Sequence, residues 1–347
     1  MPCFRTRLFR ARSFSRSSGR ALSNRIKTPD ILQSDPPGIY KETRMTLLGL
    51  LVAFGGGIFG AAIGALPAFA FVGFLTMIGV AIQLALGAGT TDFFGIPFGA
   101  FGPHAGGFAA GVAAAAYAAK KGKLDSGRNI VTAGMGLNAP DVLLVGGIFG
   151  LIGYVIFWAL QLVPSFGPGL AFSDLPAVGV VISAFLARFL WGTCGFCGKA
   201  DPGRGFFHPT DATKWLVFQS SPAQIAVIGL GGGLLGAWLG VTHGVPGALL
   251  AFGIAASSLF FLTLGVLIPV THHIMLPAAL AGVASGSVIW GAVVGILSAF
   301  LGEFCARAFL CHGDTHVDPP ACAIAVMTFA INLLTAVGFW TLVPLPV

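Results

Sequence analysis

The sequence predicts an all-α polytopic membrane protein with about nine transmembrane helices, on three observations. Of the 347 residues, 56% are hydrophobic and only 9% are charged. A soluble domain carries roughly 25% charged residues, so these charges cannot cover a water-facing surface. The chain also holds apolar stretches long enough to cross a bilayer, and its two halves share glycine and proline positions. This composition excludes a soluble globular protein, a nucleic-acid binder and a disordered chain.

The charges are divided unevenly between an N-terminal arm and the rest of the chain. Residues 1–44 hold ten Lys or Arg and three acidic residues, whereas residues 45–347 hold nine of each kind. The first 29 residues contain no acid and are rich in Arg and Ser, which is the composition of an organellar transit peptide. A basic tail against anionic lipid, or a translation start at Met45, explains the arm equally well. The expected location is an organellar membrane if the arm is a transit peptide, and otherwise the cell membrane.

The apolar stretches set the number of expected helices. They cover residues 46–66, 68–87, 94–119, 140–163, 176–197, 223–243, 245–268, 274–302 and 319–342. Each is expected to be a helix, because open sheet edges would leave backbone polar groups unpaired in lipid. Pro67 and the region from Gly244 to Pro246 separate the two closest pairs, so either pair is alternatively a re-entrant hairpin.

Self-comparison of the chain indicates an internal repeat. Gly55, Gly56, Gly57, Gly60 and Gly64 recur 176 positions later as Gly231, Gly232, Gly233, Gly236 and Gly240. At an offset of 180, Thr91, Pro97, Gly102, Asn138, Pro140 and Pro164 meet Thr271, Pro277, Gly282, Asp318, Pro320 and Pro344. Three of the four prolines between residues 91 and 164 thus find a proline at one offset. We expect two homologous halves, residues 45–164 and 223–347, joined by residues 165–222, which contain the helix at 176–197.

Each half then holds four helices, and the linker adds one. An even number of crossings returns the chain to its starting side, so one linker helix inverts the second half relative to the first. The expected architecture is a 4+1+4 inverted repeat, an arrangement common in transporters. In this arrangement seven loop Lys and Arg residues of the body fall on one side and Arg307 alone on the other, which agrees with the positive-inside rule.

Glycines spaced four apart predict close helix packing, because small residues let helix backbones approach in lipid. They form matching runs in the two halves: Gly56, Gly60 and Gly64, and Gly232, Gly236 and Gly240. A rigid bundle and a gliding surface for a moving repeat are both compatible with these runs.

Polar residues recur where the helices of the two halves begin. Asn138 and Asp318 each stand shortly before a proline, a helix-start signal in which the side chain caps free N–H groups. Such ends are polar points on a pathway if they lie below the membrane surface, and ordinary caps if they lie at its edge. The candidate pathway residues are Thr91, Asp92, Asn138, Asp141, His272, His273, Asp314, His316 and Asp318. In this hypothesis Asp92 or Asp141 carries a coupling cation or proton.

Two further features concern charge and metal chemistry. Arg188 lies in the middle of the linker helix, and a buried ion pair with Asp92 or Asp141 is its expected role. Cys311, His312 and His316 are weak candidates for one soft divalent ion, since their spacing matches no standard zinc signature.

The leading functional hypothesis is a multi-pass permease that moves a small solute or ion without ATP. The sequence holds no phosphate-binding loop and no recognisable hydrolytic motif, so we expect no enzyme and no cofactor. The expected partners are the lipid bilayer and the solute, with no nucleic acid, and a homo-oligomer is compatible with the chain. The alternatives are a channel-like pore of the same fold, a structural membrane scaffold, and a metal-dependent membrane enzyme.

Overall fold

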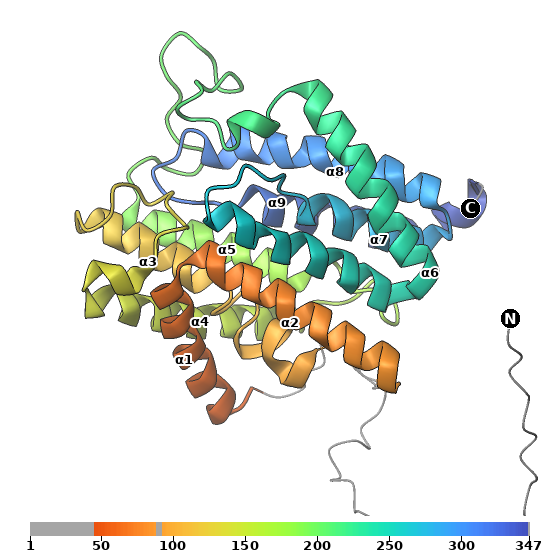
Figure 1. Ribbon diagram of the computed structural model, residues 1–347, viewed down its shortest axis with the longest axis horizontal. Helices are drawn as coiled ribbons and strands as arrows, with labels where there is room; N and C mark the ends of the chain where they lie inside the picture. The colour runs from red at the N-terminus through yellow and green to blue at the C-terminus, as the bar shows by residue number, and fades with distance from the viewer. Residues whose placement is uncertain (1–44, 88–91, 346–347) are drawn as a thin grey trace, which may run out of the picture. The chain divides into compact units, whose positions relative to one another are not determined.

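The computed structural model describes residues 45–87 and 92–345, and the regular structure of these residues is entirely helical (Figure 1). The elements are α1 (Leu47–Ile63), α2 (Ala65–Leu86), η2 (Phe93–Gly95), η3 (Ile96–Ala100), α3 (Ala109–Lys120), η4 (Gly134–Leu137), α4 (Pro140–Leu160), α5 (Leu175–Trp191), η5 (Val217–Gln219), α6 (Pro222–Thr263), α7 (His272–Ser285), α8 (Val288–Cys305), η6 (Ala306–Leu310), α9 (Pro319–Ala336) and α10 (Phe339–Leu342). The prediction of an all-helical chain is confirmed for these residues. The arm, residues 1–44, and Thr91 lie outside them.

Five helical segments are long and apolar enough to cross a membrane: α2, α4, α6, the segment Val288–Leu310 formed by α8 and η6, and α9. The helices α1 and α5 are apolar but shorter, with 17 residues each. Large apolar side chains point away from the bundle, and Val227, Trp238 and Leu297 are each more than half exposed. Exposing many such side chains to water costs free energy, whereas lipid surrounds them without this cost. The helices are therefore compatible with a membrane protein.

The two neighbouring predicted helices, 223–243 and 245–268, correspond to two helices that meet at a kink within the segment labelled α6. The segment α6 covers 42 residues, and its helix is broken at Gly244, whose φ of 63° and ψ of −143° are not helical. Glycine adopts this backbone conformation without the penalty that a side chain would bring. Pro246 follows at once and lacks the N–H that would continue the backbone ladder. We refer to residues 222–243 and 245–263 as the first and second parts of α6.

The predicted helices 94–119 and 274–302 are each interrupted. In the first, a short η3 and a series of turns over residues 101–108 precede α3, because Pro97 and Pro103 cannot donate backbone hydrogen bonds. In the second, Gly286 ends α7 with a φ of 69°, and Ser287 caps α8 through the N–H of Trp290. The helices α7 and α8 run in opposite directions, since α7 follows the first part of α6 and α8 opposes it.

Two connections that the inverted arrangement would place on opposite sides lie next to each other. Residues 121–139 join α3 to α4, and residues 311–318 lead from η6 to α9. Gly127 and Thr315 form a parallel β-bridge, and the N–H of His316 donates to the carbonyl oxygen of Gly127 at 3.0 Å. Thus α4 and α9 begin at the same end of the helices, which contradicts the inversion of the whole second half. The break at Gly286 explains the difference, because it adds one antiparallel helix to that half.

The same end of the helices gathers the basic side chains of the body, and we call it the basic face. The Arg128 guanidinium donates to the carbonyl oxygen of Thr213 at 3.0 Å, and Arg307 to that of Phe207 at 2.8 Å. Arg307 therefore lies with the others, not opposite them as the sequence predicts. The basic face carries Lys120, Lys121, Lys123, Arg128, Lys199, Arg204, Lys214 and Arg307.

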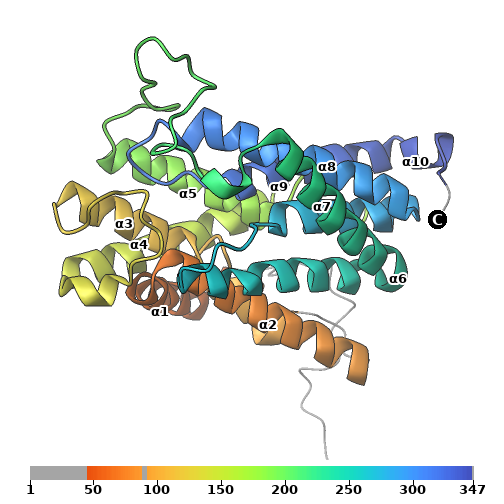
Figure 2. The same ribbon diagram turned by 45° about the horizontal axis from the view of Figure 1, so that its top comes forward.

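The first two helices of the two halves cross in a reciprocal way. Figure 2 shows the second part of α6 lying alongside α2, and these helices are in contact. A Cβ atom on Gly73 would come too close to the backbone N of Ser257, and one on Gly253 would lie 2.8 Å from Met77 Cγ. The Ser257 hydroxyl also donates to the Met77 sulfur at 3.8 Å. Residues 73 and 77 are 180 positions before residues 253 and 257, which is the offset of the shared prolines.

Of the six glycines in the two predicted packing runs, five stand at close backbone contacts and Gly232 faces side chains of α7. A Cβ atom on Gly60 would collide with the carbonyl oxygen of Gly106, and one on Gly240 with that of Ala279. The other contacts are Gly56 to Ala100, Gly64 to Val131, Gly232 to Ile274, and Gly236 to Met275. These helices thus approach at distances that larger residues would prevent.

Candidate functional site

Two cavities lie between the halves, one toward each end of the helices. The first, of about 570 Å³, has walls from α2, α5, the second part of α6, α7 and α9, and from the basic-face segments 125–131 and 212–216. The second, of about 540 Å³, is lined by the C-terminal ends of α4, α7 and α9 and by residues 163–175. Because α4 and α9 begin at the basic face, their C-terminal ends mark the opposite end.

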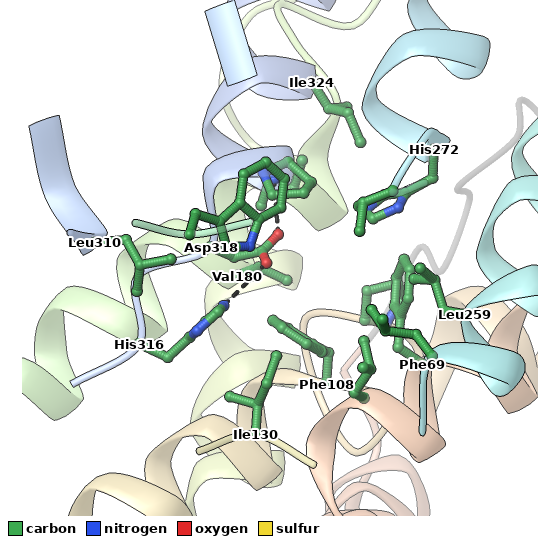
Figure 3. A pocket seen from close by; sticks show the side chains of 18 of the residues that line it. Phe69, Phe108, Ile130, Val180, Leu259, His272, Leu310, His316, Asp318 and Ile324 are labelled. Atoms are coloured by element: carbon green, nitrogen blue, oxygen red, sulfur yellow. Dashed lines mark hydrogen bonds and ion pairs between the residues drawn. The ribbon is translucent and has the colours of Figure 1, made fainter. Parts of the chain in front are cut away.

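Aromatic rings form a connected wall in the first cavity (Figure 3). Phe69 on α2 meets Phe108 at 5.6 Å and Phe252 at 5.7 Å between ring centroids, both edge to face. Phe69 also lies 4.8 Å from the His272 ring, and Phe108 lies 5.9 Å from the His316 ring. The wall therefore connects α2, in the first half, to α7 and the α9 entrance, in the second.

His316 and Asp318 face the first cavity as a hydrogen-bonded pair. His316 Nε2 lies 3.1 Å from Asp318 Oδ1, and the side-chain exposures are 4% and 13% (Figure 3). The second carboxylate oxygen accepts from the N–H of Ala321 at 2.8 Å, so Asp318 caps α9 as the sequence predicts. One residue thus both starts a helix and supplies charge to the cavity.

His272 is the first residue of α7 and lines the opposite wall of the same cavity (Figure 3). Its side chain is buried, with 5% exposure, and within the described residues its Nδ1 has no hydrogen-bond partner. A buried polar atom without a partner costs free energy of about 1–3 kcal/mol. A ligand in the cavity with a polar group near this ring would supply the missing hydrogen bond.

Asp174 lines both cavities, and sequence reasoning did not select it. It caps α5, accepting from the N–H of Ala177 at 2.8 Å. Burial raises the pKa of this carboxyl, which lies between α4 and α5, to about 6, against the opposing hydrogen bond from Ala177. The sequence does contain a signal for Asp174, because it stands two residues before Pro176. This is the same type of helix-start pattern as at Asp318.

Charged residues at the basic-face end of the first cavity are held by neighbouring loops. Asp125 accepts from the Asn129 side chain at 3.0 Å, and Arg128 donates to the carbonyl oxygen of Thr213. Burial lowers the pKa of the Arg128 guanidinium, although the nearby Cys311 opposes this shift. These contacts connect the segment after α3 to the loop before α6 at the cavity mouth.

The first-half candidates among the described residues, Asp92, Asn138 and Asp141, are not part of the lining of this cavity. Asp92 accepts from the N–H of Phe98 at 3.2 Å. Asn138 has a positive φ of 49°, and Ala139 takes the cap position without a side-chain hydrogen bond, so the predicted Asn138 cap is wrong. Asp141 instead lies 3.5 Å from Lys123 and accepts from Tyr117 at 3.1 Å.

Two second-half candidates also lie outside both cavity linings. His273 is buried 5.9 Å from the Trp215 ring, and a Cβ atom on Gly302 would lie 2.5 Å from its Nε2. Asp314 accepts from the N–H and the hydroxyl of Thr193 at 2.6 and 2.8 Å, and from Cys194 Sγ at 3.0 Å. Burial raises the pKa of the Asp314 carboxyl, but these hydrogen bonds outweigh burial and hold it below its usual range. Asp314 therefore anchors the loop after α5.

The metal candidates do not come together. His312 Nε2 lies 2.6 Å from the carbonyl oxygen of Phe206, and His316 is paired with Asp318. Across residues 45–87 and 92–345, no group of three His, Cys, Asp or Glu side chains is placed to hold a metal ion.

Arg188 is buried, but its partners differ from the predicted ion pair. It donates to the carbonyl oxygens of Phe196, Phe309 and Thr315 and to the Thr315 hydroxyl, at 2.6–2.9 Å. Asp92 and Asp141 have the other partners described above. Arg188 thus ties α5 to the end of η6 and to the segment before α9.

Comparison with known proteins gives a family without an assigned function. No curated protein and no solved structure matches the chain. A family model described as a family of unknown function (DUF7973) matches residues 39–207 and 208–344. Because these segments include most of the chain, the protein belongs to this family of unknown function.

Proposed function

We propose that the protein is a multi-pass membrane transporter of a small solute, with the two cavities as the two ends of its substrate pathway. In this proposal solute enters the first cavity from the basic face and leaves through the second, or moves in the reverse direction. Its energy comes from a gradient of the solute or of a coupled ion, since the sequence contains no ATP-binding motif.

The position of Asp174 carries the proposal. The first cavity reaches Asp174 from the basic face, and the second reaches it from the opposite end. Asp174 is half-buried among apolar helices, and in membrane proteins ionisable residues in such places are costly and mark substrate and ion pathways. A scaffold that only packs helices has no need for two cavities that share a carboxylate.

The lining of the first cavity supports a small organic solute. Ligand sites are typically about 300–1,000 Å³, mostly apolar, with a few polar groups that fix orientation. The first cavity is of this kind, with about 570 Å³, a wall of phenylalanines, and the side chains of Asp174, His272, His316 and Asp318.

The basic face supports an orientation. Cytoplasmic loops of membrane proteins are enriched in Lys and Arg. We therefore propose that the basic face, and with it the first cavity, is on the cytoplasmic side or its organellar equivalent.

Access of reagents to the residue next to Asp174 tests the proposal. Ala177 is buried and lines the first cavity close to Asp174. The variant Ala177→Cys, reconstituted in vesicles, is treated with a membrane-impermeant thiosulfonate from one side at a time. The expected result is labelling from each side, above the labelling of the unmodified chain, because a transporter exposes its site to both sides in turn.

The matched control is Ala113→Cys, which is also buried but lines neither cavity. It should remain unlabelled from both sides. Labelling of Ala177→Cys from one side alone would refute the transporter. Labelling from both sides together with an ohmic current across a planar bilayer would identify the channel-like alternative instead.

A further inference from the structure

Negative charge predominates in the inner part of the first cavity. Asp174 and Asp318 line it, and His316 balances Asp318 only when the histidine is protonated. The remaining charged side chains of the lining, Asp125 and Arg128, are held by loops at the mouth. Because the walls are otherwise apolar, the field of these carboxylates is weakly screened and attracts a positive charge.

Aromatic side chains surround the same space. Phe69, Phe108 and Phe252 pack edge to face around it, and Trp215 also lines it. A cation near an aromatic face gains about 0.5–2 kcal/mol, more when water is excluded. The same rings bury an apolar molecular body, so they suit a ligand that joins a cationic head to a hydrocarbon group.

His272 offers an independent sign of a ligand. Its ring lines the cavity, and its Nδ1 lacks a hydrogen-bond partner within the described part of the chain. An ammonium group has N–H donors that a neutral imidazole nitrogen can accept. The ring also touches Phe69, so the polar and aromatic contacts meet at one place.

Other classes of solute fit this lining less well. An anion would meet two carboxylates without a free cationic partner in the inner cavity, since Arg128 is bound to the carbonyl oxygen of Thr213. A sugar would leave most of its hydroxyls facing phenylalanine and aliphatic side chains. A bare metal ion would find no group of three ligating side chains among the described residues.

We infer that the first cavity binds a small organic cation, with its ammonium group at the carboxylates of Asp174 and Asp318 and its apolar body against Phe69, Phe108 and Phe252. This inference rests on the proposed transport function and specifies its substrate class. Asp174 lines both cavities and is therefore the carboxylate that a moving cation would meet on passing between them.

Equilibrium dialysis of the purified full-length protein with three matched probes tests the inference. The probes are benzylammonium, benzyl alcohol and benzoate, which carry a cationic, a neutral and an anionic group on the same ring. Benzylammonium should bind about tenfold more tightly than benzyl alcohol, and benzoate should bind least. Asp174→Asn should weaken the binding of benzylammonium about tenfold and leave the affinity for benzyl alcohol unchanged. Asparagine keeps the helix cap but lacks the negative charge.

The control is Asp201→Asn, which removes a carboxylate from an exposed loop and should change none of the three affinities. Equal binding of the alcohol and the ammonium, tighter binding of benzoate, or no binding of any probe would overturn the inference. So would an unchanged preference for the cation in Asp174→Asn. Two-sided labelling of Ala177→Cys combined with any of these results would refute the substrate class alone and leave the transporter standing.

Discussion

Positions that the sequence comparison pairs between the two halves differ in their surroundings. At an offset of 180 residues, Asp92 corresponds to His272 and Asn138 to Asp318. His272 and Asp318 line the first cavity, whereas Asp92 is bonded to the N–H of Phe98 and Asn138 lies in a turn before α4. The second half thus supplies both histidines and one carboxylate of the inner cavity, whereas the first half supplies Phe69 and Phe108 and the polar residues of the cavity mouth.

The difference has a local cause in the backbone. In the second half, α7 and α9 begin beside the cavity, so that His272 at the start of α7 and the cap residue Asp318 of α9 line it. In the first half, the stretch 93–108 is a sequence of short helices and turns, and the start of α4 lies at a salt bridge with Lys123. Corresponding residue types therefore do not ensure corresponding roles, because the role depends on where the helix begins in space. Three sets of variants test this difference between the halves.

The largest effect is expected where the first half packs by backbone contact. The variant Gly60→Val places side-chain atoms against the carbonyl oxygen of Gly106. Overpacking of this kind should cost about 3 kcal/mol, measured as a lower unfolding midpoint in mixed detergent and SDS. Gly55→Val lies on the same helix with open space around it and should unfold near the unmodified chain. If Gly60→Val and Gly55→Val lowered the unfolding midpoint equally, the loss of stability would come from the helix propensity of valine and not from packing.

An intermediate effect is expected where the second half combines a cap with a cavity residue. Asp318→Ala loses the hydrogen bond to the N–H of Ala321 and should cost about 1 kcal/mol of stability. Asp318→Asn retains the cap and should be nearly as stable as the unmodified chain, while binding benzylammonium several-fold more weakly. Unchanged benzylammonium binding in Asp318→Asn would remove this residue from the cavity's chemistry.

The smallest effect is expected for the first-half carboxylate at Asp141. Its pair with Lys123 is exposed, and exposed pairs contribute little to stability. Asp141→Asn should therefore change neither the unfolding midpoint nor the binding of benzylammonium. A clear loss of benzylammonium binding would return Asp141 to the pathway, where the sequence hypothesis placed it.

The helical class and the long apolar helices were predictable from composition, because low charge and 20-residue apolar stretches reflect the demands of lipid directly. The cap at Asp318 was also predictable, since the interaction is local. The directions of α8 and α9 were not predictable. They depend on the break at Gly286, and nothing in the sequence distinguishes this glycine from the many others in the chain. Asp174 was missed for a related reason: its importance depends on two cavities formed by residues distant in sequence.

The backbone hydrogen bond from His316 to Gly127 has a mechanical consequence. It joins the backbone of His316, whose side chain lines the first cavity, to the loop between α3 and α4. This loop also carries Lys123 and Arg128. A displacement of this loop would therefore shift the backbone of His316, and with it the imidazole that is hydrogen-bonded to Asp318.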